Sequence, residues 1–422
     1  MSLNFIINNS PRGSAYIGWT PILCSLQLTD AQATAVSVAI SAMATGGSGG
    51  VSFRSQKSDN PATTINLAVP ADGSGIDFFM AGTSASSSDQ DILITVKDAA
   101  SGATLATRTI MVRIRKNANT LSTSERDRFL NAIYSFNIST GNPDYNAFLV
   151  MHNDKAYNEI HTSSPTVRRY SFLIWHRAFV LDLERRLQLI DPSVTIPYWK
   201  FDEKAPNVFS ADFMGTHTAT GTLQFSSGNP MAHWRVGRKV GITRVPRFND
   251  QSGSPSSLNP PALTEDQTLK IGAQFAQFTT MEDNPHGPAH VSFSSGPINY
   301  PPTATQDPLF FLLHANVDRL WALWQKKWVR YNITQTDTYP IMGGYQPGGS
   351  QNIGDFIDDT MWPWNNVFGA PRPPSAPSHP FPPSISFTRP TPTPEVWEMI
   401  DYQGIMAGVE PNGADYDDIF YN

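Results

Sequence analysis

Six of the nine histidines in this chain fall into two triplets, and each triplet lies in apolar segments with helical spacing. The triplets are His152, His161 and His176, and His286, His290 and His314. Imidazole is a ligand for zinc, copper, iron and nickel. The triplets contain no cysteine or carboxylate, which argues against an iron site of two histidines and one carboxylate. Two sets of three imidazoles therefore predict a pair of metal ions.

The second triplet places two imidazoles on one helical face. His286 and His290 are four residues apart, so their side chains leave neighbouring turns of a helix on the same side. Pro288 lies between them and fits only near a helix start. We therefore expect Asn284 to cap this helix and Pro285 to lie in its first turn.

The first triplet cannot come from one continuous helix. His152 and His161 are nine residues apart, which is half a turn out of phase. We expect the helix to end near Glu159, with His161 on the loop that follows. His176 and His314 each lie inside a long apolar run, where a buried imidazole needs a polar partner.

Five further ionisable residues receive smaller roles. His217, His233 and His379 lie in loop or proline-rich segments and are interpreted as surface or structural residues. Glu282 and Asp318 each lie four residues from a predicted ligand. We expect them to accept hydrogen bonds from the ligands or to act as a base.

Composition excludes several other classes of protein. The net charge of −6 gives no case for binding nucleic acid or an anionic membrane. Cys24 is the single cysteine, which excludes an internal disulfide and a thiolate metal cluster. No run reaches the ~18 apolar residues of a spanning helix. The N-terminus has no signal-peptide pattern, so we expect a soluble protein, cytoplasmic rather than secreted.

Two regions of different character surround these residues. Residues 1–112 alternate apolar and polar positions, as at Val36, Val38 and Ile40, between turns rich in Gly and Ser. This pattern predicts an all-β N-terminal domain, an immunoglobulin-like sandwich with an accessory role. Residues 113–422 are predicted to form the catalytic domain.

The predicted catalytic domain combines helices with long loops. A capping box formed by Ser122 and Glu125 opens its first helix. Helical patterns then cover about 143–159, 167–190, 266–282, 285–291 and 307–330. The expected loops are a long insertion at 203–263, a proline-rich segment at 370–394 and a C-terminal tail.

The histidine segments resemble the motifs of the tyrosinase family of coupled binuclear, or type 3, copper proteins. FLVMH at His152, His161, and SFLIWHRAFVLDLE around His176 resemble the copper A motif. EDNPHGPAH and NYPPTATQDPLFFLLHANVDRLWALWQ resemble the copper B motif. The resemblance covers roughly residues 113–422 and leaves out residues 1–112.

The resemblance implies an α four-helix bundle that holds two copper ions. The first triplet would bind copper A and the second copper B. In this family the copper pair uses O₂ to oxidise o-diphenols (catechols) to o-quinones, and tyrosinases also hydroxylate monophenols. The expected partner is therefore a small phenolic substrate, and the expected activity is that of a polyphenol oxidase.

Three residues bear on the choice of substrate. In many members that hydroxylate monophenols, an Asn follows the first copper B histidine, and with a nearby Glu it holds a water that deprotonates the phenol. Glu282 resembles that Glu, but Gly287 stands in the place of the Asn. We therefore expect diphenol oxidation to exceed monophenol hydroxylation. Val291, after the second copper B histidine, is small and should leave the pocket open.

Three other functions would use the same histidines. A haemocyanin-like O₂-binding protein would differ by a lid that keeps phenols from the metals. An o-aminophenol oxidase of the same fold is not separated from a catechol oxidase by these motifs. A dizinc hydrolase would need a bridging carboxylate, and the sequence places none at the site.

Overall fold

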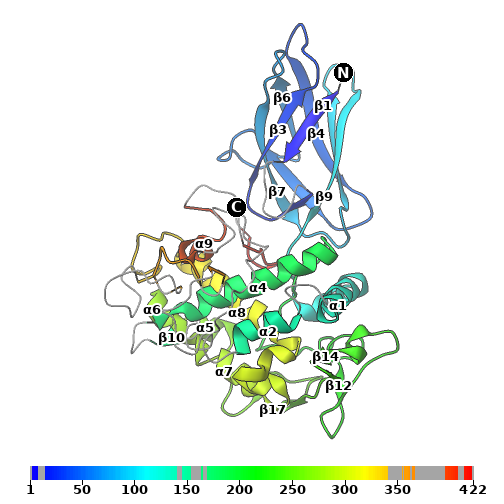
Figure 1. Cartoon of the computed structure of the whole chain (residues 1–422). Helices are drawn as coiled ribbons and strands as arrows, with labels where there is room; N and C mark the ends of the chain where they lie inside the picture. The colour runs from blue at the N-terminus through cyan, green and yellow to red at the C-terminus, as the bar shows by residue number, and fades with distance from the viewer. Residues whose placement is uncertain are drawn as a thin grey trace. The chain divides into compact units, whose positions relative to one another are not determined.

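The computed structural model describes residues 2–7, 15–139, 145–153, 163–164, 169–340, 354, 356–361, 364–365, 395–406 and 413–420. The chain divides into two compact units. One comprises Met1–Arg115 together with Gly408–Asn422, and the other comprises Lys116–Ala407 (Figure 1). The predicted metal ligands all belong to the second unit.

The first unit is β-rich, as predicted, and contains two sheets (Figure 1). The four-stranded sheet has the order β1 (Leu3–Ile7), β3 (Ile22–Leu28), β7 (Ile76–Ser84) and β5 (Gly50–Arg54). The five-stranded sheet has the order β2 (Tyr16–Ile17), β9 (Thr104–Val112), β8 (Ile92–Asp98), β4 (Val36–Ala44) and β6 (Thr64–Val69). Their neighbours pair antiparallel except β2 and β9, which pair parallel.

The alternating pattern of the sequence fixes which face of each strand is buried. In β4 and β8 the register places Ile40 opposite Val96, and both are fully buried. Phe78 and Met80 of β7 are equally buried in the same apolar core. The two sheets therefore share one core, because side chains two apart in a strand point to the same face.

The C-terminal segment adds polar contacts to this first unit. The backbone N–H of Trp19 donates to the Asp415 carboxylate at 2.9 Å, and its indole N–H donates to the Tyr416 carbonyl at 2.8 Å. The Arg115 guanidinium donates to the Tyr416 hydroxyl at 2.8 Å. Hydrogen bonds between residues nearly 400 positions apart in the sequence thus stabilise the first unit.

The second unit contains four described helices longer than six residues. These are α1 (Thr123–Asn137), α2 (Tyr145–Asn153), α4 (Ser171–Ile190) and α8 (Leu309–Trp328). The predicted capping box is confirmed, since the Ser122 hydroxyl accepts from the Glu125 N–H and the Glu125 carboxylate accepts from the Ser122 N–H. α4 and α8 are buried along nearly their whole length. They pack against each other, as expected for helices that are apolar on most faces.

The rest of the described part of this unit consists of short elements. The short helices are α5 (Glu265–Thr268), α6 (Phe275–Phe278), α7 (His286–Val291) and α9 (Val396–Ile400). The 3₁₀ turns are Ala118–Thr120, Pro230–His233, Pro255–Ser257, η5 (Thr279–Glu282), η6 (Pro297–Asn299) and Pro301–Gln306. The two-residue strands are Ser163–Ser164, Arg169–Tyr170, Thr216–His217, Leu223–Gln224, Arg235–Val236, Lys239–Val240 and Val245–Pro246, with Phe293–Ser295 one residue longer.

The prediction of a four-helix bundle is wrong. α4 and α8 form a helix pair, but the segment that carries His286 and His290 is the six-residue α7. Turns and two-stranded sheets fill much of the described part between α4 and α8. The cause lies in the prolines of this stretch, which lack the N–H that a long helix needs. Among the described helices, none is long and apolar enough to cross a bilayer.

Candidate metal centre

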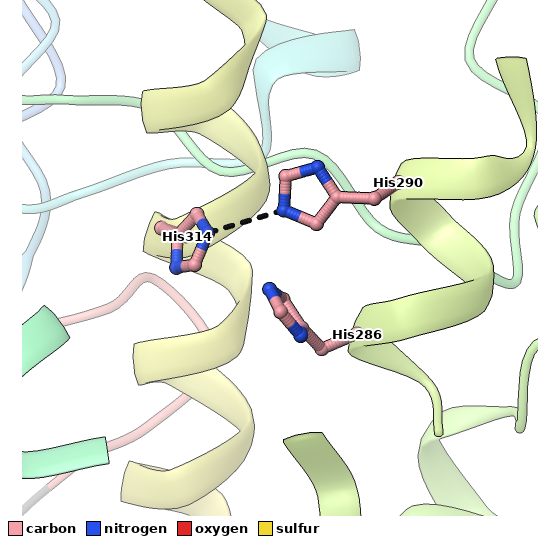
Figure 2. Close-up of side chains that lie close together, drawn as sticks. All are labelled: His286, His290 and His314. Atoms are coloured by element: carbon pink, nitrogen blue, oxygen red, sulfur yellow. Dashed lines mark hydrogen bonds between the residues drawn. The ribbon is translucent and has the colours of Figure 1, made fainter. Parts of the chain in front are cut away.

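Three imidazoles converge between α7 and α8. Figure 2 shows His286 and His290 leaving α7 toward His314 of α8. One ring nitrogen from each residue lies within 4.8 Å of the other two. Nε2 of His290 and Nε2 of His314 lie 3.3 Å apart. Donor atoms this close surround a space that suits a single metal ion.

Backbone carbonyls set the tautomers of the two ligands on α7. Nδ1 of His286 lies 2.9 Å from the Glu282 carbonyl oxygen, and Nδ1 of His290 lies 2.7 Å from that of Ile298. A carbonyl oxygen only accepts, so each Nδ1 carries the hydrogen and donates it. Nε2 of each ring is then unprotonated, with its lone pair available to a metal.

Two members of the first triplet lie beside this group. His176 of α4 donates from Nδ1 to the Phe172 carbonyl at 2.8 Å, which leaves its Nε2 as a ligand atom. Its ring stacks on that of His314, with centroids 4.3 Å apart. The His152 ring, from α2, lies 5.6 Å from that of His176. His161 lies outside the described residues.

The environment keeps two imidazoles of the second triplet, those of His290 and His314, neutral. Burial lowers the pKa of His290 from 6.5 to about 4. Burial, with smaller contributions from the neighbouring histidines, holds the pKa of His314 well below 6.5. A neutral imidazole is the form that binds a metal. This all-imidazole donor set, in which backbone carbonyls orient the half-buried His286 and His290 and His314 is fully buried, therefore fits copper, for which imidazole is a suitable ligand.

A pocket of about 360 Å³ opens beside the histidines. The residues that line it are His152, Phe172, His176, Glu282, His286, Gly287, His290, Val291, Asn299, Pro301 and Ala304. Seven of these eleven were named from the sequence as candidate site residues, and Phe172 lies in the segment that resembles the copper A motif. Asn299, Pro301 and Ala304 lie in the segment that resembles the copper B motif, but no role was predicted for them because no spacing pattern links them to the histidines.

The structure also places the three residues that bear on substrate choice. Glu282 ends η5, and its carbonyl holds the ring of His286. Gly287 lies in α7 outside the left-handed region, and an added Cβ would meet only the Glu282 carbonyl oxygen, at 3.7 Å. Val291 is 48% exposed at the end of α7. All three line the pocket.

Three local predictions differ from the structure. Asn284 does not cap α7, because Pro285 occupies the N-cap position. The Asn284 side-chain oxygen accepts from the Leu263 N–H at 2.7 Å instead. The Asp318 carboxylate forms a buried ion pair with Arg177. The carbonyl of Glu282, rather than its carboxylate, is the acceptor for His286.

Comparison with known proteins identifies this region. Residues 142–327 match the model of the common central domain of tyrosinase. The chain carries a tyrosinase domain. A tyrosinase of Streptomyces antibioticus is 29% identical over 282 residues, which span 60% of this chain and 93% of the relative. The tyrosinase resemblance of the histidine motifs is therefore confirmed, and the protein is an oxidase of the tyrosinase type.

Relatives of the tyrosinase domain include proteins with other names. Grixazone synthase of Streptomyces griseus is 28% identical over 310 residues, which span 60% of this chain and 94% of the relative. The solved structure of active aurone synthase, a polyphenol oxidase, is 18% identical with a TM-score of 0.36, and the match covers 51% of this chain and 72% of that one.

Proposed function

We propose that this protein is a copper-dependent oxidase that uses O₂ to convert o-diphenols to o-quinones. Each diphenol gives up two electrons and two protons, so one O₂ accepts the electrons of two diphenols and leaves as two waters. The observation that carries the proposal is the convergence of five imidazoles from α2, α4, α7 and α8: four of them line one pocket, and the fifth, His314, groups with His286 and His290. The tyrosinase domain supports the same chemistry.

The residues divide into two ligand sets in this proposal. His286, His290 and His314 would hold one copper, and His152 and His176, with the sequence-predicted His161, would hold the other. Two bound coppers would supply the electron transfer between the diphenol and O₂. The chain itself provides imidazoles that backbone carbonyls orient, at His176, His286 and His290, and an apolar surround. Phe310 stacks on the His314 ring at 4.1 Å and helps to exclude water.

Monophenol hydroxylation is proposed as the weaker activity. A monophenol has a pKa of about 10, like tyrosine, and must lose its proton before it binds as a phenolate. Glu282 lines the pocket as the candidate base. Gly287, beside it, offers no side chain to hold a water, so deprotonation should be slow.

Oxygen uptake by the copper-loaded protein tests the proposal. We expect rapid uptake with a catechol, slower uptake with the matching monophenol, and loss of both in His314→Ala. His217→Ala is the matched control. Nδ1 of His217 lies 3.1 Å from the Asp250 carboxylate, and His217 does not line the pocket. Reversible O₂ binding without turnover would favour the haemocyanin-like alternative. Uptake that is fastest with an o-aminophenol would favour the aminophenol oxidase.

A further inference from the structure

A buried ion pair between Arg244 and Asp307 lies directly before α8. Nε and Nη2 of Arg244 donate to the two carboxylate oxygens of Asp307, both at 2.7 Å. Nη1 donates to the Met214 carbonyl at 3.1 Å, and both side chains of the pair are at most 1% exposed. The Asp307 carboxylate also accepts from the Leu309 N–H at 3.0 Å, an N–H that no carbonyl within the helix can satisfy. The ion pair therefore fixes the point at which α8 begins.

Two other buried side chains donate to residues 305–307, the pre-α8 segment that ends at this ion pair. The Trp234 indole N–H donates to the Gln306 carbonyl at 3.0 Å. The Tyr145 hydroxyl donates to the Thr305 carbonyl at 3.1 Å. Trp234 is fully buried and Tyr145 is nearly so. Together with the ion pair, these contacts fix all three residues of the segment, although the donors lie far from it in the sequence.

The pre-α8 segment connects two helices that each carry a candidate metal ligand. His314 lies in the second turn of α8, so its position follows from where that helix begins. Tyr145 is the first residue of α2, and His152 follows two helical turns later on nearly the same face. The rings of His152 and His314 lie 6.4 Å apart. The contacts of the segment therefore set one ligand of each predicted set relative to the other.

Arg244 also lies beside the chain that follows α7. It directly precedes β16 (Val245–Pro246), which pairs antiparallel with β17 (Phe293–Ser295). β17 begins two residues after α7, which carries two ligands of the second triplet. The insertion predicted from the sequence at 203–263 thus reaches the elements on both sides of this triplet.

We propose that the pre-α8 segment positions the metal ligands, and that Arg244 is the positioning residue that holds it in place. The proposal rests on the metal binding that the proposed function requires. Arginine suits this role because its planar fork meets both oxygens of a carboxylate at once, whereas lysine offers a single nitrogen. Without the fork, the buried Asp307 carboxylate loses its counter-charge and cannot keep its place at the start of α8. His314 would then approach the other ligands less closely.

Metal binding by full-length variants tests this role. Cobalt(II) added to the metal-free protein is the probe, because its visible absorption reports the number and arrangement of its ligands. We expect Arg244→Lys and Asp307→Asn to weaken the binding of at least one ion about tenfold and to change the absorption spectrum, as for other residues that orient metal ligands. Affinity and spectrum equal to those of the native chain would overturn the proposal.

A matched variant separates positioning from a general loss of stability. Arg186 is also a buried arginine, but its ion pair with Asp182 lies within α4. Arg186→Lys should lower the melting temperature as Arg244→Lys does, while the cobalt affinity and spectrum of the folded protein stay near those of the native chain. If Arg186→Lys weakens cobalt binding as much as Arg244→Lys does, the positioning role is wrong.

Tyr145→Phe tests the same segment with little risk to folding, because it removes one hydroxyl and keeps the ring. The loss of the hydrogen bond to Thr305 should weaken cobalt binding severalfold, and unchanged binding would contradict a positioning role of the segment. The measurement needs no turnover. Cobalt binding that depends on Arg244, without catechol oxidation by the copper-loaded protein, would overturn the proposed function alone. Failure of the native chain to bind cobalt or copper would overturn both.

Discussion

Position 287 is where a single side chain is expected to change the balance of activities. The backbone of Gly287 lies outside the left-handed region, and a Cβ there would make only an ordinary contact at 3.7 Å. Asn is also slightly more favourable than Gly inside a helix. The site therefore accepts a side chain, and its glycine is not required by the fold.

We expect Gly287→Asn to raise the rate of monophenol hydroxylation relative to diphenol oxidation by about tenfold. The amide can hold a water beside Glu282, and a positioned base contributes roughly 10²–10⁴-fold, of which a part should be recovered. Rates with a monophenol and the matching catechol, each normalised to copper content, measure the effect. Gly287→Ala fills the same space without the amide and should leave the ratio near that of the native chain. An equal gain in both variants would mean that the amide is not involved.

Among the secondary-structure elements, α4 and α8 are joined by a buried ion pair between Arg177 and Asp318. Arg177 follows His176, and Asp318 lies one turn after His314, so the pair connects the two helices beside their ligands. The Arg177 guanidinium also lies 3.7 Å from the centroid of the Trp321 ring and donates to Gln325 at 2.9 Å. This arrangement fixes the spacing of two ligand-bearing helices.

A double-mutant cycle on this pair has a defined expected outcome. Asp318→Leu alone should destabilise the protein by about 3–5 kcal/mol, because it leaves a buried guanidinium without its counter-charge. Arg177→Met with Asp318→Leu should cost less than the sum of the two single changes. Denaturant unfolding of the metal-free variants measures the free energies. Strict additivity would show that the two side chains do not stabilise each other.

The helix α9 carries a carboxyl group with a raised pKa. Burial, with a smaller contribution from Glu395, raises the pKa of Glu398 from 4.5 to about 8. The folded state therefore holds a proton that the unfolded state releases above pH 4.5. Stability contributed by this proton is present at low pH and is lost as the pH rises toward 8.

We expect the melting temperature of the metal-free protein to fall between about pH 4.5 and pH 8, and to fall less in Glu398→Gln. The neutral amide keeps an oxygen that can accept the hydrogen bond from the Glu395 N–H, which the native carboxylate accepts at 2.9 Å. At the higher pH the variant should be more stable than the native chain by up to a few kcal/mol, on the order of the pKa difference. Parallel pH profiles of the two proteins would contradict this assignment.

On the scale of the whole molecule, the ligands and the pocket belong to one of the two units. We expect a fragment of Lys116–Ala407 to fold and to bind copper, because its helix pair and its described histidines are all internal to it. Copper content and circular dichroism of the purified fragment check this. A fragment that is soluble but free of copper would show that the first unit is needed to form the site.

The sequence alone was enough to identify the candidate ligand residues. It was also enough to predict the long helices that carry several of them. His286 with His290, and the apolar runs around His176 and His314, are local patterns whose meaning follows from helical periodicity. The capping box at Ser122 is equally local. Such signals involve residues within a few positions of one another, so they can be read before the chain path is known.

Only the tertiary structure showed which groups contact those residues. The Ile298 carbonyl that orients His290, the Asn299 amide at the pocket and the Asp318 carboxylate on Arg177 all depend on turns and on packing between distant segments. The contacts of Asp415 and Tyr416 with Trp19 join the two ends of the chain. The prediction of a four-helix bundle was wrong because it, too, depended on packing between distant segments. Periodicity predicts that a helix forms, whereas its length and its partners depend on prolines and on burial against the rest of the molecule.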